Sequence, residues 1–318
     1  MISFAFVAVP VLAAVLGMPA SVESIFAVVF GLLIGSFLNA AIYRLPEPHL
    51  TLSSPKRSMC PKCGHQLSWS ENLPVLSWIL QRGRCRWCQV PISPRYPLVE
   101  LLTGALFLLA YRATPDGQLG LLLIAWLVLA GLVVATFVDF DRFEIPDEIS
   151  IGGMWAAPVL SVIVPQLHRD TSVAQMLSDG PQVDRIGALV GSLAGLAVGG
   201  GVLIGIGWIG KLVYGRDAMG FGDVKLLAAG GGFVGPGGAL AALAIGSCVA
   251  SVAGLVNLVR FTCLVRQRAR ARGGKRPLGK ALAVGRIAGR YLPFGPYLGI
   301  GIGFALLAWD HLVRLLPL

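Results

Sequence analysis

The chain has 318 residues, of which 55% are hydrophobic and only 13% are charged, and it contains 41 glycines. A soluble protein of this length could not bury so much apolar surface, so the composition excludes an ordinary soluble domain and places most of the chain in lipid. The formal net charge of +10 comes without an aromatic and basic stripe or a nucleic-acid-binding motif. It therefore indicates membrane topology, and we expect no nucleic-acid partner.

Apolar stretches along the chain predict the membrane spans. Each is long enough, or nearly so, to cross a hydrocarbon core of about 30 Å. The predicted helical spans are 24–43, 97–112, 119–138, 149–164, 186–212, 224–235, 238–260 and 292–314. The fold class is therefore an all-α polytopic membrane protein with about eight transmembrane helices. The apolar stretch 2–17 precedes them, and it is a further span, an uncleaved leader or an artefact of start-codon choice.

The segments between these spans differ in charge. We place residue 44 in the cytoplasm. The cytoplasmic segments and the span ends next to them then hold all of the 26 Lys and Arg residues except Arg112, Arg169, Arg185 and Arg314. Cytoplasmic loops carry an excess of basic residues, so this orientation is the predicted one. The insertion 165–185 then lies on the far side, and we expect it to be a plain polar loop.

The long polar segment 44–96 carries two CxxC pairs, formed by Cys60, Cys63, Cys85 and Cys88. Each pair can lie on a tight turn that points two sulfurs inward, and two such turns provide the tetrahedral thiolate ligands that Zn²⁺ prefers. The alternative, a pair of disulfides, is disfavoured in the reducing cytoplasm. Four thiolates leave no open coordination position, so the predicted zinc is structural. The nearby His65 is expected to be a spectator.

Two groups of acidic residues adjoin spans on the same predicted side. One lies in VDFDRFEIPDE (138–148) and includes Asp139, Asp141 and Asp147; the other is Asp223, which lies between Gly222 and Val224 in MGFGDVK. Ionisable groups at membrane depth are costly and are functional candidates by default. Taken singly, each acid also fits a structural role, because Asp139 and Asp141 could end a helix at the water interface and Asp223 could cap one.

The combination of the two acidic groups favours catalysis. Two helix ends on one side could bring Asp139 and Asp223 together, and two adjacent carboxylates share a proton, so that one activates water and the other protonates a scissile carbonyl. Gly220 and Gly222 would leave room for a substrate backbone beside Asp223. The chain has no HExxH or GxSxG motif. The residues alone do not choose among Asp139, Asp141 and Asp147.

Several motifs together resemble those of the type IV prepilin peptidases, the GxGD class of aspartic proteases in the bacterial inner membrane. The two CxxC pairs lie where that family has a cytoplasmic zinc-binding domain. The other motifs occur in the family's order over about residues 24–310: GSFLNAAIYRLP at 35–46, ENLPVLSW at 71–78, RYPLVE at 95–100, VDFDRFEIPD at 138–147, MGFGDVK at 219–225 and PFGPYL at 293–298.

The resemblance implies an activity and assigns its residues. The family's catalytic aspartates correspond to Asp139 and Asp223. The family cleaves the short basic leader of type IV prepilins or pseudopilins after a glycine, at the cytoplasmic face of the inner membrane. Many members also methylate the new N-terminal residue with S-adenosylmethionine, although no motif here locates that cofactor. The resemblance also implies three parts of the chain. Residues 1–43 form an N-terminal segment with the first span, residues 44–96 a zinc-binding domain, and residues 97–318 a peptidase domain.

Charge suggests a further role for the acids beside the proposed pair. A basic leader would be attracted by a group of carboxylates that Arg142 partly offsets, namely Asp141, Glu144, Asp147 and Glu148. Replacing Asp147 and Glu148 by their amides should then raise the KM. Asp147, Gly220 and Gly222 are accordingly expected to position the substrate.

The chain departs from the family pattern in three places. The insertion 165–185 lengthens the separation between the two aspartates, and the apolar stretch 2–17 has no clear counterpart. The basic loop 265–290 is extended, and we expect it to contact anionic lipid headgroups. The glycine runs 199–201 and 230–232 are expected to pack helices together.

Two functions of other classes remain as alternatives. An ion or proton transporter could use the carboxylates as a relay, but transporter sites tend to lie near the membrane midplane rather than at its surface. A non-catalytic membrane scaffold with a zinc module would leave both acidic motifs without a role.

Overall fold

The computed structural model describes residues 20–47, 49–52, 57–178, 180, 182–215, 219–271 and 293–315. Within these ranges every regular element is a helix, and there is no β-strand, only the isolated bridges Met59–Gln66 and Arg84–Pro91. The predicted all-α class is confirmed. The stretch 2–17 lies outside the described residues, as does most of the predicted basic loop 265–290.

The long helices follow the predicted spans closely. They are α2 (Ala20–Arg44), α4 (Arg95–Ala113), α5 (Leu119–Arg142), α6 (Asp147–Ile163), α8 (Arg185–Tyr214), α9 (Phe221–Ala271) and α11 (Gly295–Leu315), with the short α3 (Leu76–Leu80) and η1 (Ser70–Asn72) between α2 and α4. Among the described residues, five helices are long and apolar enough to cross a membrane: α2, α4, α5, α8 and α9. Helix α6 has 17 residues, and the apolar part of α11 is Gly295–Ala308. The predicted count of eight crossings is not confirmed.

Helix α9 joins the two predicted spans 224–235 and 238–260 across a kink. Gly235 has φ 73° and ψ 176° inside the helix, and Pro236 follows it. Proline removes a backbone donor and clashes with the preceding turn, and only glycine readily adopts the conformation seen at residue 235. A β-carbon at Gly235 would also lie 2.7 Å from Thr171 Oγ1. The part of α9 before the kink is therefore a short segment that begins at the Asp223 motif.

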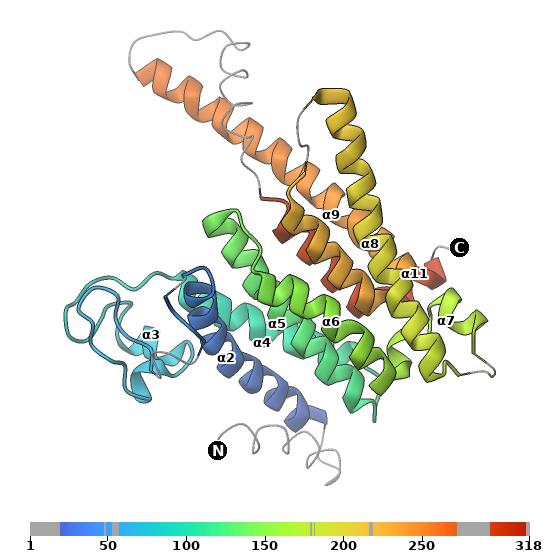
Figure 1. Ribbon diagram of the computed structural model, residues 1–318. Coiled ribbons are helices and arrows are strands. Elements are labelled where there is room, and N and C mark those ends of the chain that lie inside the picture. Colours follow the sequence, from blue (N-terminus) through green and yellow to red (C-terminus); the bar gives the residue numbers. More distant parts are fainter. Residues whose placement is uncertain are drawn as a thin grey trace.

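Helix α5 is the central element of the bundle. Its side chains contribute to all three hydrophobic clusters, which pack it against α2 and α4 on one side and against α6 and α11 on the other, in a cluster that α8 and α9 also join. Trp126 stacks on Phe107 of α4 with ring centroids 4.9 Å apart and donates a hydrogen bond to the Phe107 carbonyl at 3.0 Å. Figure 1 shows α5 between these two groups of helices, with α3 and its loops beside α2. This packing fixes the position of the last turn of α5, which carries Asp139.

Glycines allow α8 and α9 to approach until their backbones touch. A β-carbon on Gly195 would overlap the carbonyl of Gly231, and a β-carbon on Gly231 would overlap that of Gly195. Small residues at such crossings are typical of membrane helices. In the runs 199–201 and 230–232 every glycine except Gly201 contacts a neighbouring helix. The prediction that these runs pack helices is confirmed for all but that residue.

The insertion between the two acidic motifs is folded, so the prediction of a plain loop was wrong. It forms η2 (Pro165–His168) and α7 (Ser172–Met176). His168 is fully buried and lies within hydrogen-bond distance of Ser161 Oγ (3.0 Å) and Thr171 Oγ1 (3.3 Å). Burial lowers the pKa of His168 to about 4, so the ring is neutral at pH 7. A polar sequence concealed this element because its histidine also packs against α8, where the β-carbon position of Gly191 lies 3.3 Å from the His168 ring.

The crossing of α8 and α9 predicts opposite effects for two glycines of one helix. Gly195→Ala should lower the free energy of unfolding by about 1–3 kcal/mol, because a methyl group must displace the α9 backbone. Gly201→Ala, whose β-carbon would meet nothing within 4 Å, should leave stability unchanged or raise it by up to about 1 kcal/mol. Thermal unfolding of the full chain in detergent compares them. Equal effects of the two variants would contradict the proposed backbone contact.

Candidate active site

Asp139 is buried at the C-terminal end of α5, with 5% of its surface exposed. Its Oδ2 accepts a hydrogen bond from the backbone N–H of Gly295, 3.0 Å away, at the first residue of α11. The first N–H groups of a helix have no partner within it and are suited to bind a carboxylate. A β-carbon on residue 295 would lie 2.5 Å from that same Oδ2. Gly295 is therefore part of the site, a role that the PFGPYL motif did not reveal from the sequence.

The chain turns sharply directly after Asp139. Phe143 ends α5 in the left-handed conformation, with φ 57°, and its N–H donates a hydrogen bond to the Asp139 carbonyl at 3.0 Å. Such a conformation is uncommon for a bulky residue. The turn places Ile145 between two glycines, because the β-carbon positions of Gly222 and Gly295 lie 3.4 Å and 3.1 Å from its side-chain atoms. Ile145 thus packs the three motif segments together.

Asp223 lies in the first turn of α9 and is half-buried. It lines the same pocket as Asp139. The pocket has a volume of about 490 Å³, and α6 contributes Asp147 and Glu148 to its wall. The structure therefore brings together the two aspartates that the sequence suggested as a pair, from helices that are far apart along the chain.

The two glycines of the second motif have different surroundings. Gly222 packs against Ile145, so its missing side chain is used for contact between helix ends. Gly220 is exposed at the pocket, where its β-carbon position lies 3.3 Å from Asp223 Oδ2. Of the two, only Gly220 leaves open space beside the Asp223 carboxylate.

The remaining acids of the first motif divide into two sets. Asp141 does not line the pocket, and its carboxylate forms an ion pair with Arg95 at 2.7 Å. Asp147 lines the pocket and forms an ion pair with Lys225 of α9. Glu144 and Glu148 also line it, and neither forms an ion pair with any residue that the structure describes. Arg142, which was expected to offset this group, pairs with Glu47 instead.

The four CxxC cysteines form one cluster. Their sulfurs all lie within 4.8 Å of one another, Cys60 Sγ is 3.8 Å from Cys88 Sγ, and none of the four is in a disulfide. A tetrahedral ion with Zn–S bonds of about 2.3 Å separates its sulfurs by about 3.8 Å, so the donor set fits such an ion. His65 is not a member of the cluster, and its ring contacts that of Trp87.

The cluster is built from two turns with the same backbone pattern. In the first, the Cys60 N–H donates to the His65 carbonyl and the Gly64 N–H donates to the Cys60 carbonyl. In the second, the Cys85 N–H donates to Val90 and the Gln89 N–H donates to Cys85. Gly64 and Gln89, at φ 70° and 56°, occupy equivalent left-handed positions. Two copies of one local turn thus direct four sulfurs to a common point.

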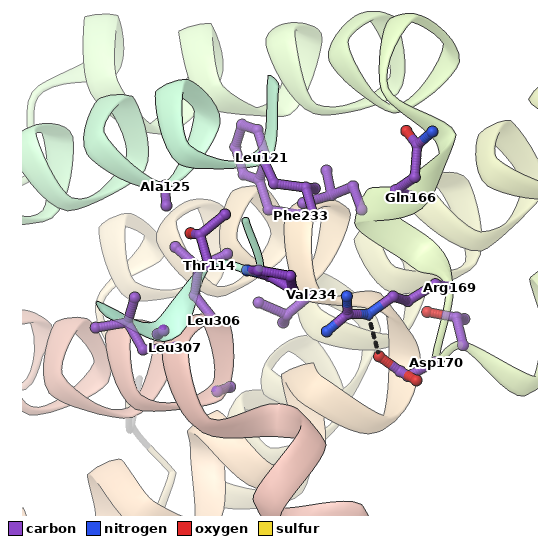
Figure 2. A pocket seen from close by; sticks show the side chains of 15 residues that line it. Thr114, Leu121, Ala125, Gln166, Arg169, Asp170, Phe233, Val234, Leu306 and Leu307 are labelled. Atoms are coloured by element: carbon purple, nitrogen blue, oxygen red, sulfur yellow. Dashed lines mark hydrogen bonds and ion pairs between the residues drawn. The ribbon is translucent and has the colours of Figure 1, made fainter. Parts of the chain in front are cut away.

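A second pocket lies near the opposite end of α5, where Leu121 and Ala125 line it (Figure 2). Its volume is about 90 Å³, and its wall includes Arg169 and Asp170, which form an ion pair at 3.0 Å. No residue of the acidic motifs lines it. The larger pocket with Asp139 and Asp223 is therefore the candidate active site.

Comparison with known proteins identifies the family of the chain. Residues 29–114 match the family model of the bacterial peptidase A24 N-terminal domain, and residues 126–255 match that of the type IV leader peptidase family. A prepilin leader peptidase/N-methyltransferase from Aeromonas hydrophila is 34% identical over 90% of both chains. A type 4 prepilin-like proteins leader peptide-processing enzyme from Escherichia coli is 32% identical over 84% of this chain and 93% of its own. No solved structure matches.

The two family models together cover both the cysteine cluster and the two acidic motifs. The similarity to the Aeromonas hydrophila protein extends over nearly the whole length of both chains. The chain therefore belongs to the type IV leader peptidase family, and it is an enzyme of the peptidase class.

Proposed function

We propose that this chain is an aspartic endopeptidase that cleaves the leader from type IV prepilins or pseudopilins, with Asp139 and Asp223 as its catalytic pair. The observation that carries the proposal is the single pocket that both carboxylates line. The names of the similar proteins, which refer to prepilin leaders, support the substrate class. The carboxylates lie in the last turn of α5 and the first turn of α9, which suits a surface site better than a transporter relay.

In the proposed reaction the two carboxylates take different roles. Asp139 accepts the Gly295 N–H at Oδ2, and a carboxylate held in this way is suited to be the ionised partner that removes a proton from water. Asp223 carries the shared proton and gives it to the scissile carbonyl oxygen as the water attacks. When the C–N bond of the tetrahedral intermediate breaks, the proton that Asp139 has taken passes to the leaving amine, and a hydroxyl proton of the intermediate returns to Asp223, which restores the pair.

We assign the charged rim of the pocket to the leader. Glu144 and Glu148 have no ion pair among the described residues, so their charges are available to a basic leader. Asp147 is bound to Lys225, and we propose that it positions the first turn of α9 and, with it, Asp223. Gly220 leaves space for the substrate backbone beside that carboxylate.

We further propose the orientation and cofactors that the sequence suggested. The end of the bundle with the pocket faces the cytoplasm of the inner-membrane protein, in accord with its basic loops. Cys60, Cys63, Cys85 and Cys88 would hold a structural Zn²⁺, because four thiolates leave no open coordination position. The name N-methyltransferase of the similar proteins supports methylation of the new N-terminal residue, for which S-adenosylmethionine would supply the methyl group.

Removing either carboxylate should abolish cleavage. Asp139→Asn and Asp223→Asn should each lower the rate by at least about a hundredfold, because general acid and base catalysis needs both groups. The rate is measured with a prepilin and the purified full chain in detergent. Mass spectrometry of the mature product shows in the same sample whether its N-terminus gains a methyl group.

Asp116→Asn is the matched control for these variants, because Asp116 is exposed and lies in the segment between α4 and α5, away from the pocket. It should cleave at the wild-type rate. Wild-type cleavage by either the Asp139 or the Asp223 variant would show that the assignment of the pair is wrong.

The cysteine cluster predicts one zinc ion per chain. The full chain purified under reducing conditions should contain stoichiometric zinc by elemental analysis, and Cys60→Ser should lose most of it. Cys248→Ser combined with Cys263→Ser should keep it, since both residues are exposed on α9 outside the cluster. A wild-type chain without zinc, or equal loss in both variants, would exclude the tetrathiolate site.

The charged rim predicts a salt-dependent effect on substrate binding. Glu144→Gln with Glu148→Gln should raise the KM for a basic leader by roughly twofold to fivefold and leave kcat nearly unchanged, as expected for exposed charge pairs. High salt should remove the difference by screening. Steady-state kinetics at two salt concentrations measure both effects. A KM that does not change at low salt would exclude the electrostatic role.

A further inference from the structure

Arg95 joins the cysteine-containing segment to the turn that carries Asp139. It is the first residue of α4, and its Nη1 donates hydrogen bonds to both carboxylate oxygens of Asp141 at 2.7 Å. Its Nη2 donates to the Phe137 carbonyl at 3.2 Å, and its Cζ lies 4.9 Å from the centre of the Phe137 ring. One guanidinium therefore contacts three groups within a single turn of α5.

The helical geometry places this contact opposite the catalytic carboxylate. Residues 137 and 141 are four apart and share one face of α5, whereas residue 139 is two positions from each and points to the other side. On that other side Asp139 accepts the N–H of Gly295. The last turn of α5 is thus held between α4 on one face and α11 on the opposite face.

This turn needs support from outside the helix. The last carbonyl groups of a helix lack internal partners, and α5 ends at Phe143 in a conformation that is costly for a bulky side chain. A cation near a helix C-terminus is also favourable for the helix dipole. Arg95 supplies a positive charge beside this helix end, and it holds the last turn through Asp141 and the Phe137 carbonyl.

The start of α4 is itself fixed by the segment before it and by α2. The Tyr96 carbonyl accepts a hydrogen bond from Asn39 Nδ2 of α2 at 3.0 Å. The buried Glu100 accepts one from the N–H of Val75 at 2.7 Å, in the loop before α3, where Val75 has φ 61°. Arg95 therefore extends from an anchored helix start to the end of α5.

We propose that Arg95 is a positioning residue that aligns Asp139 for catalysis through its contacts with Asp141 and Phe137. On this proposal, which rests on the proposed peptidase function, Asp141 holds the catalytic turn in place and does not attract the leader. The side chains of Arg95 and Asp141 are 33% and 43% exposed, so the ion pair contributes little to global stability. Its effect is expected on the rate of the chemical step.

The kinetic test compares Arg95, at the start of α4, with an arginine of the preceding cysteine-containing segment. Arg95→Ala should lower kcat for prepilin cleavage by about tenfold, with KM changed less than about twofold. Arg86→Ala, an exposed arginine between Cys85 and Trp87, should leave both constants unchanged. Arg95→Lys should recover part of kcat, because it keeps the charge but cannot contact the carboxylate and the carbonyl together.

A double-mutant cycle and hydrogen exchange separate alignment from general destabilisation. Asp141→Asn should lower kcat as Arg95→Ala does, and the two changes together should have little more effect than either alone. Amide exchange in residues 137–145 should be faster in Arg95→Ala, while exchange in residues 122–132 of the same helix should not change. If Arg95→Ala does not fold, Asp141→Asn and Arg95→Lys carry the same test.

The outcomes distinguish this inference from the proposed function. Wild-type kcat in Arg95→Ala, multiplicative effects in the cycle, or unchanged exchange in residues 137–145 would overturn the positioning role. Asp139→Asn is measured alongside. If it is inactive while Arg95→Ala is fully active, only the inference fails; if Asp139→Asn is fully active, the catalytic assignment itself fails.

Discussion

One hydrogen bond from the start of α11 to the end of α5 determines how the candidate site is built. A buried carboxylate is unfavourable unless polar groups bind it, and Asp139 receives the N–H of Gly295, a residue 156 positions later. The contact requires glycine at 295, because a β-carbon there would lie 2.5 Å from the carboxylate oxygen. It also requires α11 to begin beside the point where α5 ends. The packing of α5 at the centre of the bundle meets that requirement.

Around this contact the charges of the two acidic motifs are divided among separate partners. Asp141 faces Arg95 outside the pocket, Asp147 faces Lys225 at its rim, and Asp139 and Asp223 share its interior. The partners come from different parts of the chain. Within one cluster of acids, Asp141 and Asp147 therefore hold helices together, while Asp139 and Asp223 are left for the proposed chemistry. Close helix packing makes this possible, since glycines bring α8 and α9 into backbone contact and hold the start of α9 near the end of α5.

The sequence predicted the parts of this protein that depend on local patterns. Apolar stretches located the long helices, and the spacing of the CxxC pairs predicted the cluster of four sulfurs, because each pair lies on one local turn. The acidic motifs identified Asp139 and Asp223 as candidates, but only the resemblance to a family preferred Asp139 over its neighbours. Gly295, Arg95 and buried His168, which packs against Gly191 of α8, were missed as structural partners. Their roles come from contacts between distant segments, which neither periodicity nor motif spacing encodes.

The most direct test of the central claim is to locate the scissile bond on the enzyme. A prepilin with a photoreactive side chain in place of the residue before that bond would be bound to the Asp139→Asn/Asp223→Asn double variant and cross-linked, and the attachment site would be mapped by mass spectrometry. We expect cross-links to residues that line the pocket of the two aspartates, such as Phe143, Ile145 and Phe221. Cross-links that map instead to the second pocket beside Arg169, or outside both pockets, would contradict the assignment of this site.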